Sequence, residues 1–312
     1  MQLIENISKE LNAPPEMLFD AIRQSRKLVK HIKMKKRNGS DRTVYQPSKK
    51  LKIIQYWLIN NIFVNLKVHY VATAFLKDIS IKNNALRHVN GRYFLKLDIK
   101  DYFPSIKFGD FQPIICRWIA EKNPPIIESE LLKVVQLSCF YRNDCLPIGY
   151  PSSPIISNIV MYEFDTKIVA SLSSTDQYGA AAYTRYADDM TFSTKTKGAC
   201  NNINSLVEKT LAEIESPKLK LNSSKTSFVS SSGGSALVTG LRICHDGHLT
   251  IHRKYKDKIR LLLSLYKKGT LAKNDIYSLK GHLAHIRHVD GLFYTKLQNK
   301  YFKTIQKLLI IE

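Results

Sequence analysis

The segment AAYTRYADDMTFSTK, residues 181–195, constrains the fold more than any other part of the chain. Two runs rich in β-forming residues, 181–186 and 190–194, flank a short turn that holds Asp188 and Asp189. This pattern predicts a β-hairpin with two adjacent carboxylates at its tip. Neighbouring carboxylates repel each other unless a cation neutralises them, although an Asp-Asp pair can also serve the turn alone.

A further carboxylate lies in an upstream segment with strand character. In GRYFLKLDIKDYFPSI, a turn at Asn90 and Gly91 precedes a β-rich run over residues 93–99, which is typical of a buried sheet. Asp98 is the anomaly in this run, and a lone buried Asp usually pairs with a backbone donor or a cation. Together with the hairpin pair it supplies the carboxylates for phosphoryl transfer, which uses two metal ions about 3.5 to 4 Å apart.

The predicted metal is Mg²⁺, with Mn²⁺ as a substitute. Magnesium prefers oxygen ligands and retains waters, so a few carboxylates plus substrate phosphates suffice. Asp98 and Asp188 are predicted to bridge two ions, and Asp189 to complete the shell. One ion would lower the pKa of an attacking primer hydroxyl, while the other would hold the triphosphate and stabilise the leaving pyrophosphate. These three aspartates are the predicted catalytic residues.

The charge of the chain indicates a polyanionic partner. The chain has 48 Lys and Arg against 26 Asp and Glu, a net charge of +22, which favours nucleic acid. A membrane surface is the other usual partner of such charge, but no run of about 18 apolar residues is present. The N-terminal segment also lacks the pattern of a secretory signal. We therefore expect a cytoplasmic protein without a membrane partner.

Several other classes are excluded by missing motifs. The sequence has neither a G-x-x-x-x-G-K-[ST] nor a G-x-G-x-x-G phosphate loop, and no short repeat. Its five cysteines form no C-x-x-C pair, and their odd number argues against a closed disulfide framework. Buried thiols are the favoured interpretation.

Helical and strand patterns alternate along the chain, which predicts an α+β fold. The run RKLVKHIKMKKR, residues 26–37, favours a basic, partly amphipathic helix, followed by a turn in NGSDR and an extended RTVYQPS. Further helices are expected over residues 51–66, 128–141, 153–172 and 199–214. After a Ser/Gly-rich connector at 230–236, the segment from Leu249 to the end has 14 Lys or Arg and 4 acids, as expected for helices that touch a phosphate backbone.

Between Arg42 and Gly240 the motifs follow the order found in reverse transcriptases, and the chain resembles that family. LKLDIKDYF resembles the first catalytic palm motif, and YADD resembles the family's defining hairpin. The resemblance implies that Asp98 binds metal, that the carbonyl of Ile99 also ligates it, and that Phe103 excludes a ribose 2′-hydroxyl.

Three more residues are implied to contact the nucleotide. LPIGYPSSPIISN resembles the loop and helix that support template and incoming nucleotide, and Gly149 would let backbones approach closely. Many relatives have Gln where this chain has Ile148. LNSSKT resembles a downstream motif that would place Lys225 near the pyrophosphate, with a solvated lysine as the alternative. Arg42 resembles the residue that grips the triphosphate.

Two motifs resemble those of the retron class within the family. NNALRHV contains Asn84 and His88, and VTGLRI contains Val238, Thr239 and Gly240. The short polar side chains could contact RNA edges or 2′-hydroxyls, and Gly240 could permit close approach. The structural alternatives are a helix-capping Asn, a buried hydrogen-bonded His, and an ordinary strand followed by a turn.

The family implies a right-hand polymerase architecture with fingers, palm and helical thumb. The expected limits are fingers at 1–90 with 109–150 contributing, palm at 91–108 and 151–244, and thumb at 245–312. In the thumb, Lys254, Lys258 and Arg260 would contact phosphates. His282, His285 and His288 lack the spacing of a zinc site and favour core or nucleic-acid roles.

The retron resemblance also implies partners. These are a dedicated structured noncoding RNA that supplies the template and a 2′-hydroxyl primer, deoxynucleoside triphosphates, a host ribonuclease H, and a separate effector protein in defence against phage. The product would be a branched RNA–DNA hybrid. Alternatives are another bacterial reverse transcriptase of the group II intron or abortive-infection type, an RNA-templated RNA polymerase, or a noncatalytic RNA-binding scaffold.

Overall fold

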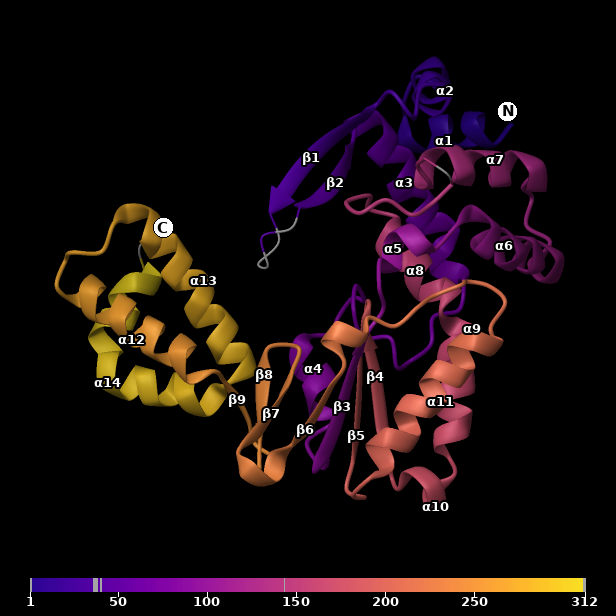
Figure 1. Cartoon of the computed structure of the whole chain (residues 1–312). Helices are drawn as coiled ribbons and strands as arrows, with labels where there is room; N and C mark the ends of the chain where they lie inside the picture. Colours follow the sequence, from indigo (N-terminus) through magenta and orange to yellow (C-terminus); the bar gives the residue numbers. More distant parts are fainter. Residues whose placement is uncertain (1, 36–38, 40, 143, 311–312) are drawn as a thin grey trace.

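The computed structural model describes residues 2–35, 39, 41–142 and 144–310. It has mixed α and β structure, is mostly helical, and contains three antiparallel sheets (Figure 1). The first half of the chain contains α1 (Gln2–Leu11), α2 (Pro15–Arg23), β1 (Val29–Lys35), β2 (Asp41–Pro47), α3 (Lys49–Asn61), η1 (Phe63–Asn65), α4 (Ile81–Leu86), β3 (Tyr93–Asp98), α5 (Tyr102–Ser105), α6 (Phe108–Lys122) and α7 (Glu128–Cys139).

The second half begins with two helices that follow each other closely and ends in three long ones. Its elements are α8 (Ser153–Val160), α9 (Tyr162–Leu172), α10 (Thr175–Tyr178), β4 (Ala182–Tyr186), β5 (Asp189–Thr194), α11 (Ala199–Glu213), η2 (Ser223–Lys225), β6 (Ser227–Ser230), η3 (Ser231–Gly233), β7 (Ser235–Val238), β8 (Leu241–Cys244), β9 (Leu249–Ile251), α12 (Arg253–Lys267), α13 (Lys273–Val289) and α14 (Gly291–Ile310). None of the helices in the described ranges is long and apolar enough to cross a membrane.

A four-stranded sheet in the order β4-β5-β3-β6 forms the centre of the molecule. Helices α9 and α11 run alongside it (Figure 1). On β4 and β5, Tyr183 stacks on Phe192 with ring centroids 4.5 Å apart, and both rings are buried. Cross-strand aromatic pairs of this kind stabilise a sheet and fix its register. The hairpin predicted at 181–194 is therefore confirmed.

The buried hydrophobic residues form two large cores and one small cluster of Leu51, Tyr141 and Tyr150. The first joins helices α1, α2, α3, α6, α7, α8, α9 and α11 to the central sheet. The second joins β7–β9 to α12, α13 and α14, and the side chains of Ala85 and Phe94 reach into it from α4 and β3. The last three helices thus form a separate bundle that is anchored on the edge of the central sheet (Figure 1).

The basic helix predicted over residues 26–37 is wrong. Residues 29–35 form strand β1, which pairs along its whole length with β2 from Val29–Pro47 to Lys35–Asp41. Residues 36 and 37, and residues 38 and 40 of the turn predicted in NGSDR, lie outside the described residues. Almost every β1 side chain is exposed, so burial does not select a helix here, and hairpin pairing with the neighbouring β2 overrides the helical periodicity.

The cysteine prediction is correct for only two of the five residues. All five are free thiols; Cys139 and Cys200 are buried, but Cys116, Cys145 and Cys244 are half-buried. The predicted helix over 153–172 is also interrupted at Met161, which separates α8 from α9. The final helices predicted after Leu249 are confirmed as α12–α14.

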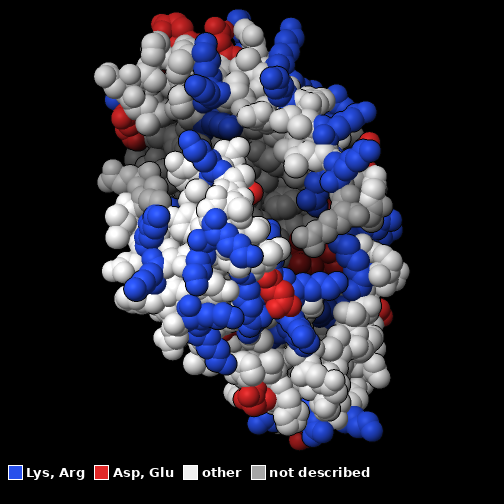
Figure 2. All heavy atoms as spheres, turned by 90° about the vertical axis from the view of Figure 1, so that its left-hand side faces the viewer, with Lys and Arg blue, Asp and Glu red and all other residues white. Residues whose placement is uncertain are grey.

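Lys and Arg are numerous on the side of the molecule that Figure 2 shows. The β1–β2 ribbon and the α12–α14 bundle extend toward the same side (Figure 1), and Lys and Arg are spread over that side with few acids among them (Figure 2). A surface of this sign attracts a phosphate backbone. The distribution supports nucleic acid as the polyanionic partner.

Candidate active site

Antiparallel pairing brings the three predicted catalytic aspartates together. Asp98, the last residue of β3, lies directly opposite Asp189, the first residue of β5. Asp188 precedes Asp189 in the hairpin turn, and its carbonyl accepts a hydrogen bond from Ile99 N at 3.1 Å. The ends of two neighbouring strands thus gather three carboxylates at one edge of the sheet.

The hairpin turn has a strained backbone. Tyr186 pairs with Asp189, so only Ala187 and Asp188 connect the strands. Ala187 has φ +58°, in the left-handed region that costs a residue with a side chain about 1 to 2 kcal/mol. Its carbonyl accepts a hydrogen bond from Arg185 Nη1 at 3.3 Å, which helps to hold the turn in this conformation.

Arg185 is a buried support that the sequence analysis missed. Its guanidinium pairs with Asp165 at 2.7 Å, and both side chains are 0% exposed. Arg185 Nη1 also donates to the Tyr102 hydroxyl at 3.0 Å and to Asn158 Oδ1 at 3.2 Å. The sequence does contain a signal for Arg185. It is a charged residue among the apolar and aromatic residues of a predicted strand, and a buried charge needs a partner.

The carboxylates are electrostatically suited to a cation. Burial, followed by the charge of Asp189, raises the pKa of Asp188 to about 6. The pKa of Asp189 is also raised, by partial removal from water and by the charge of Asp98. A bound divalent ion would offset both the removal of these carboxylates from water and the repulsion between them. The site therefore fits the divalent metals that carboxylate oxygens bind.

The segment before β6 contacts Asp98 from the opposite side. Lys225 Nζ donates to Asp98 Oδ2 at 2.6 Å, and Asn222 Nδ2 donates to Asp98 Oδ1 at 3.2 Å. The hydrogen bond to Asp98 raises the pKa of Lys225, so its ammonium stays charged. The structure therefore places Lys225 at the carboxylates rather than in solvent alone, although 57% of its side chain is exposed.

Acid pH is expected to weaken metal binding at this site. The pKa of Asp188 in the folded protein, about 6, exceeds its usual value of 3.8. The ionised carboxylate therefore destabilises the folded protein fully above pH 6, and this cost disappears as the carboxylate is protonated at lower pH. Because an incoming cation must displace the proton below pH 6, the apparent Mn²⁺ affinity should fall by about tenfold per pH unit there. Calorimetric titration at pH 5, 6 and 7.5 measures this, and an affinity independent of pH would contradict it.

The other predicted nucleotide contacts lie on α5, on β2 and in the loop before α8. Phe103, half-buried in α5, has its ring centroid 6.4 Å from that of Phe75. Gly149 has φ +106°, and a Cβ there would lie 2.7 Å from Tyr45 O of strand β2. The close approach seen at Gly149 is to the backbone of β2, and its contact with a nucleotide stays a prediction. Arg42, on the same strand, is exposed.

Comparison with known proteins identifies the family. The model of the family "Reverse transcriptase (RNA-dependent DNA polymerase)" matches residues 34–263. The retron Ec73 reverse transcriptase of Escherichia coli is 46% identical over 274 residues, which cover 87% of this chain and 86% of that protein. The chain belongs to the retron reverse transcriptases. It is accordingly an RNA-dependent DNA polymerase, and enzymes of this family typically use divalent metal ions.

Other relatives of this retron reverse transcriptase agree in sequence or in fold. The retron Ec86 reverse transcriptase of Escherichia coli is 32% identical over 273 residues, covering 84% of this chain and 78% of that protein. Telomerase from Candida tropicalis, solved with a fragment of telomeric RNA, matches with a TM-score of 0.54 at 13% identity. That match covers 94% of this chain and 58% of the telomerase chain, and it concerns the fold alone.

The structure brings the two retron-class motifs into contact. Asn84 Nδ2 donates to Thr239 Oγ1 at 3.2 Å, and Thr239 Oγ1 donates to Ile81 O at 3.2 Å. Asn84 and Val238 are buried, whereas Thr239 is half-buried and Gly240 is exposed. In this retron reverse transcriptase the motifs therefore dock α4 against the β7–β8 turn, and of these four residues only Thr239 and Gly240 reach the surface.

His88 has the environment of a structural histidine. It is 0% exposed, and its two ring nitrogens lie 2.8 Å from Ser193 Oγ and 2.7 Å from Thr184 Oγ1. Burial, with a smaller contribution from Arg87, lowers the pKa of His88 to about 4, so the ring is neutral at physiological pH. Its side chain fixes the end of α4 to β4 and β5, so an influence on RNA binding would be indirect.

Proposed function

We propose that this retron reverse transcriptase copies a dedicated structured noncoding RNA, primed from an RNA 2′-hydroxyl, into branched multicopy single-stranded DNA that serves antiphage defence. The observation that carries the catalytic part is the pairing of Asp98 with Asp189 beside Asp188. The similarity to retron Ec73 reverse transcriptase over most of both chains supports the retron type.

Asp98, Asp188, Asp189 and the carbonyl of Ile99 would hold two Mg²⁺ ions, or Mn²⁺ in their place. When bound, such ions lower the pKa of the attacking hydroxyl and stabilise the leaving pyrophosphate. Lys225 is charged and adjacent to Asp98, a position from which it can stabilise or protonate the pyrophosphate. Arg42 and Gly149 would position the triphosphate.

The three-lobe architecture is part of the proposal. Fingers at 1–90 with 109–150, palm at 91–108 and 151–244, and thumb at 245–312 agree with a helical bundle that has its own core. On α12, Lys254, Lys258 and Arg260 are exposed and suited to phosphate contacts. Arg260 is also braced by Asp257 at 2.7 Å.

The proposed partners follow from this reaction. They are the cognate RNA and its RNA–DNA product, deoxynucleoside triphosphates, a host ribonuclease H that trims the template, and a separate effector protein in the cytoplasm. The positively charged side in Figure 2 supports the nucleic-acid partners.

Synthesis without an added primer tests the proposal. The enzyme is purified with its co-purifying RNA, given Mg²⁺ and labelled deoxynucleotides, and the product is treated with ribonuclease. Labelled DNA that retains a short RNA branch is expected, and Asp188→Asn with Asp189→Asn should abolish it. Synthesis only from an added primer would exclude the self-primed reaction, and RNA binding without any synthesis would favour a scaffold.

Replacing Phe103 by Ala is expected to increase ribonucleotide incorporation relative to deoxynucleotides by about 10- to 100-fold, because the ring that would meet the 2′-hydroxyl is removed. Single-nucleotide kinetics with matched dNTP and rNTP measure the ratio. Phe75→Ala is the matched control, since that ring is 50% exposed and neighbours Phe103. An unchanged ratio in Phe103→Ala would rule out this residue as the sugar filter.

A further inference from the structure

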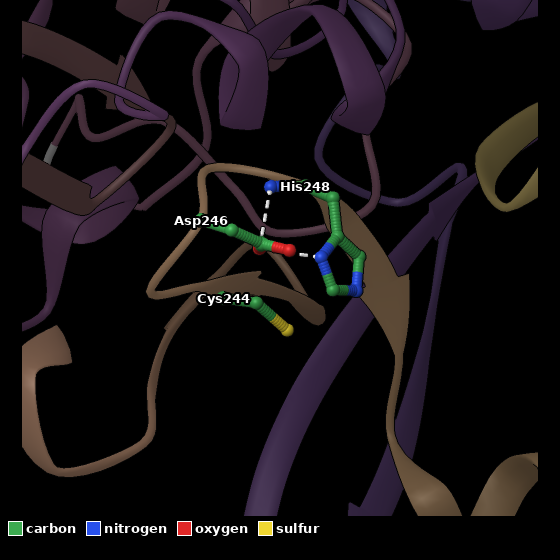
Figure 3. A group of neighbouring side chains, drawn as sticks. All are labelled: Cys244, Asp246 and His248. Carbon is green, nitrogen blue, oxygen red and sulfur yellow. Dashed lines mark hydrogen bonds and ion pairs between the residues drawn. The ribbon is translucent and has the colours of Figure 1, made fainter.

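A second group of metal-ligating side chains lies away from the central sheet, in the turn between β8 and β9. Cys244, Asp246 and His248 occupy alternate positions of CHDGH and gather around one point (Figure 3). One ligand atom from each residue lies within 4.8 Å of the others. Outside the active site, this is the one such group of at least three His, Cys, Asp or Glu among the described residues.

The backbone of the turn holds these side chains in place. Cys244 N donates to His248 O at 3.0 Å, and Gly247 N donates to Cys244 O at 2.9 Å. Gly247 has φ +81°, which a glycine adopts without strain, and a Cβ there would lie 3.3 Å from Val89 O. Strand β8 is anchored by the buried Leu241 and Ile243. Because three ligands come from five consecutive residues, little chain entropy is lost when they converge.

The acid and the imidazole already contact each other. Asp246 Oδ1 lies 2.5 Å from His248 Nδ1 and accepts a hydrogen bond from His248 N at 3.2 Å (Figure 3). The side chains of His248 and Asp246 are 48% and 67% exposed, so an ion can enter from solvent. Small side-chain rotations would bring all three ligand atoms to bonding distances of about 2.0 to 2.3 Å.

We propose that Cys244, Asp246 and His248 form a binding site for one zinc-class divalent ion, with water in the remaining position. A thiolate combined with an imidazole and a carboxylate selects a soft or borderline metal, whereas Mg²⁺ requires oxygen ligands. The site is therefore chemically distinct from the three catalytic carboxylates, and it is independent of the proposed function.

The location of the site gives the ion a structural consequence. Strand β9 leads directly into α12, and Asp290 ties this junction by accepting from Thr250 Oγ1 at 2.6 Å and Ile251 N at 3.3 Å. An ion on the preceding turn would join the ends of β8 and β9 in addition to their backbone hydrogen bonds. It would thereby stiffen the chain where the helical bundle begins.

Cobalt binding to the reduced full-length protein tests the site without measuring activity. Co²⁺ coordinated by a thiolate gives a near-ultraviolet charge-transfer absorption, which carboxylate-only sites do not give. We expect this band to saturate at one equivalent, to bleach on adding Zn²⁺, and to persist in excess Mg²⁺. A missing band, or one that Mg²⁺ removes, would overturn the proposal.

Variants assign the ligands. Cys244→Ser should eliminate the band, and His248→Ala should weaken Co²⁺ binding by more than about tenfold. Cys116→Ser is the matched control, because Cys116 Sγ also lies beside a carboxylate, Glu128 at 3.3 Å, but belongs to no such group. A band that survives in Cys244→Ser would refute the site. Since His248 is exposed, its variant keeps the test decisive even if Cys244→Ser does not fold.

Discussion

Asp188→Asn is expected to lower the rate of DNA synthesis by at least about 10³-fold while leaving the metal-free protein at least as stable as the parent. A carboxylate that holds catalytic ions contributes several kcal/mol to transition-state stabilisation, and about 4 kcal/mol corresponds to this loss in rate. Asn keeps the size of the side chain but removes the charge. Primer extension under single-turnover conditions measures the rate.

The stability result follows from the raised pKa of Asp188. Its folded-state value of about 6 lies above the usual 3.8, so at pH 8 the ionised carboxylate opposes folding. Removing that charge should raise the free energy of unfolding by about 1 to 2 kcal/mol without metal, after allowance for solvent screening. Urea denaturation at pH 8 and at pH 4 measures it, and the gain should shrink at the lower pH.

Asp176→Asn is the matched control for this prediction. Asp176 is exposed in α10, so its replacement should change neither synthesis nor stability by more than about 0.5 kcal/mol. Near-normal synthesis by Asp188→Asn would contradict the assignment of the hairpin carboxylate as a metal ligand. Lost stability without metal would contradict the electrostatic argument.

Asp165→Asn is expected to reduce the free energy of unfolding by about 3 to 5 kcal/mol. Arg185 would then remain buried without its counter-charge, and Tyr183 would lose its carboxylate acceptor, which lies 2.8 Å from its hydroxyl. Any fraction that folds should also synthesise DNA more slowly, because Arg185 supports the strained Ala187 beside the proposed metal-binding acids. Urea denaturation and specific activity of the folded fraction measure the two effects.

Glu163→Gln provides a control on the same helix. Glu163 pairs with Lys167 at 3.1 Å, but both side chains are largely in solvent. Loss of such an exposed pair should cost less than about 1 kcal/mol. If Asp165→Asn were equally mild, the buried pair would not be what stabilises the hairpin.

The β4–β5 hairpin and strand β3 could be predicted from sequence because their signals are local. Alternating β-forming residues place the YADD hairpin, and a single acid in the apolar run of β3 identifies Asp98. The hairpin at β4–β5 and strand β3 appear where the pattern indicates them. Their mutual register, which decides that Asp98 faces Asp189, is a long-range property that no spacing along the chain contains.

The other sequence predictions failed because the periodicity of one segment does not show which partner stabilises it. Strand β1 is stabilised by β2 rather than by its own periodicity, and Arg185 is stabilised by an acid twenty residues away. The sequence left two roles open for His88, RNA contact or a buried hydrogen-bonded side chain. It could not decide between them because the hydrogen-bond partners of His88 lie on β4 and β5. The cluster at Cys244 was missed because sequence reasoning considered cysteine pairs rather than mixed ligands around a turn.

The contact between β2 and the loop at Ile148 and Gly149 determines which side chains these two loop positions can hold. Tyr45 N donates to Ile148 O at 2.7 Å, so position 148 joins the ribbon through an atom that every residue possesses. The next position must be glycine for the two backbones to come this close, because a Cβ on Gly149 would clash with Tyr45 O. Two adjacent positions therefore differ in what they tolerate: the first can hold side chains as different as Gln and Ile without breaking this joint, and the second accepts only glycine.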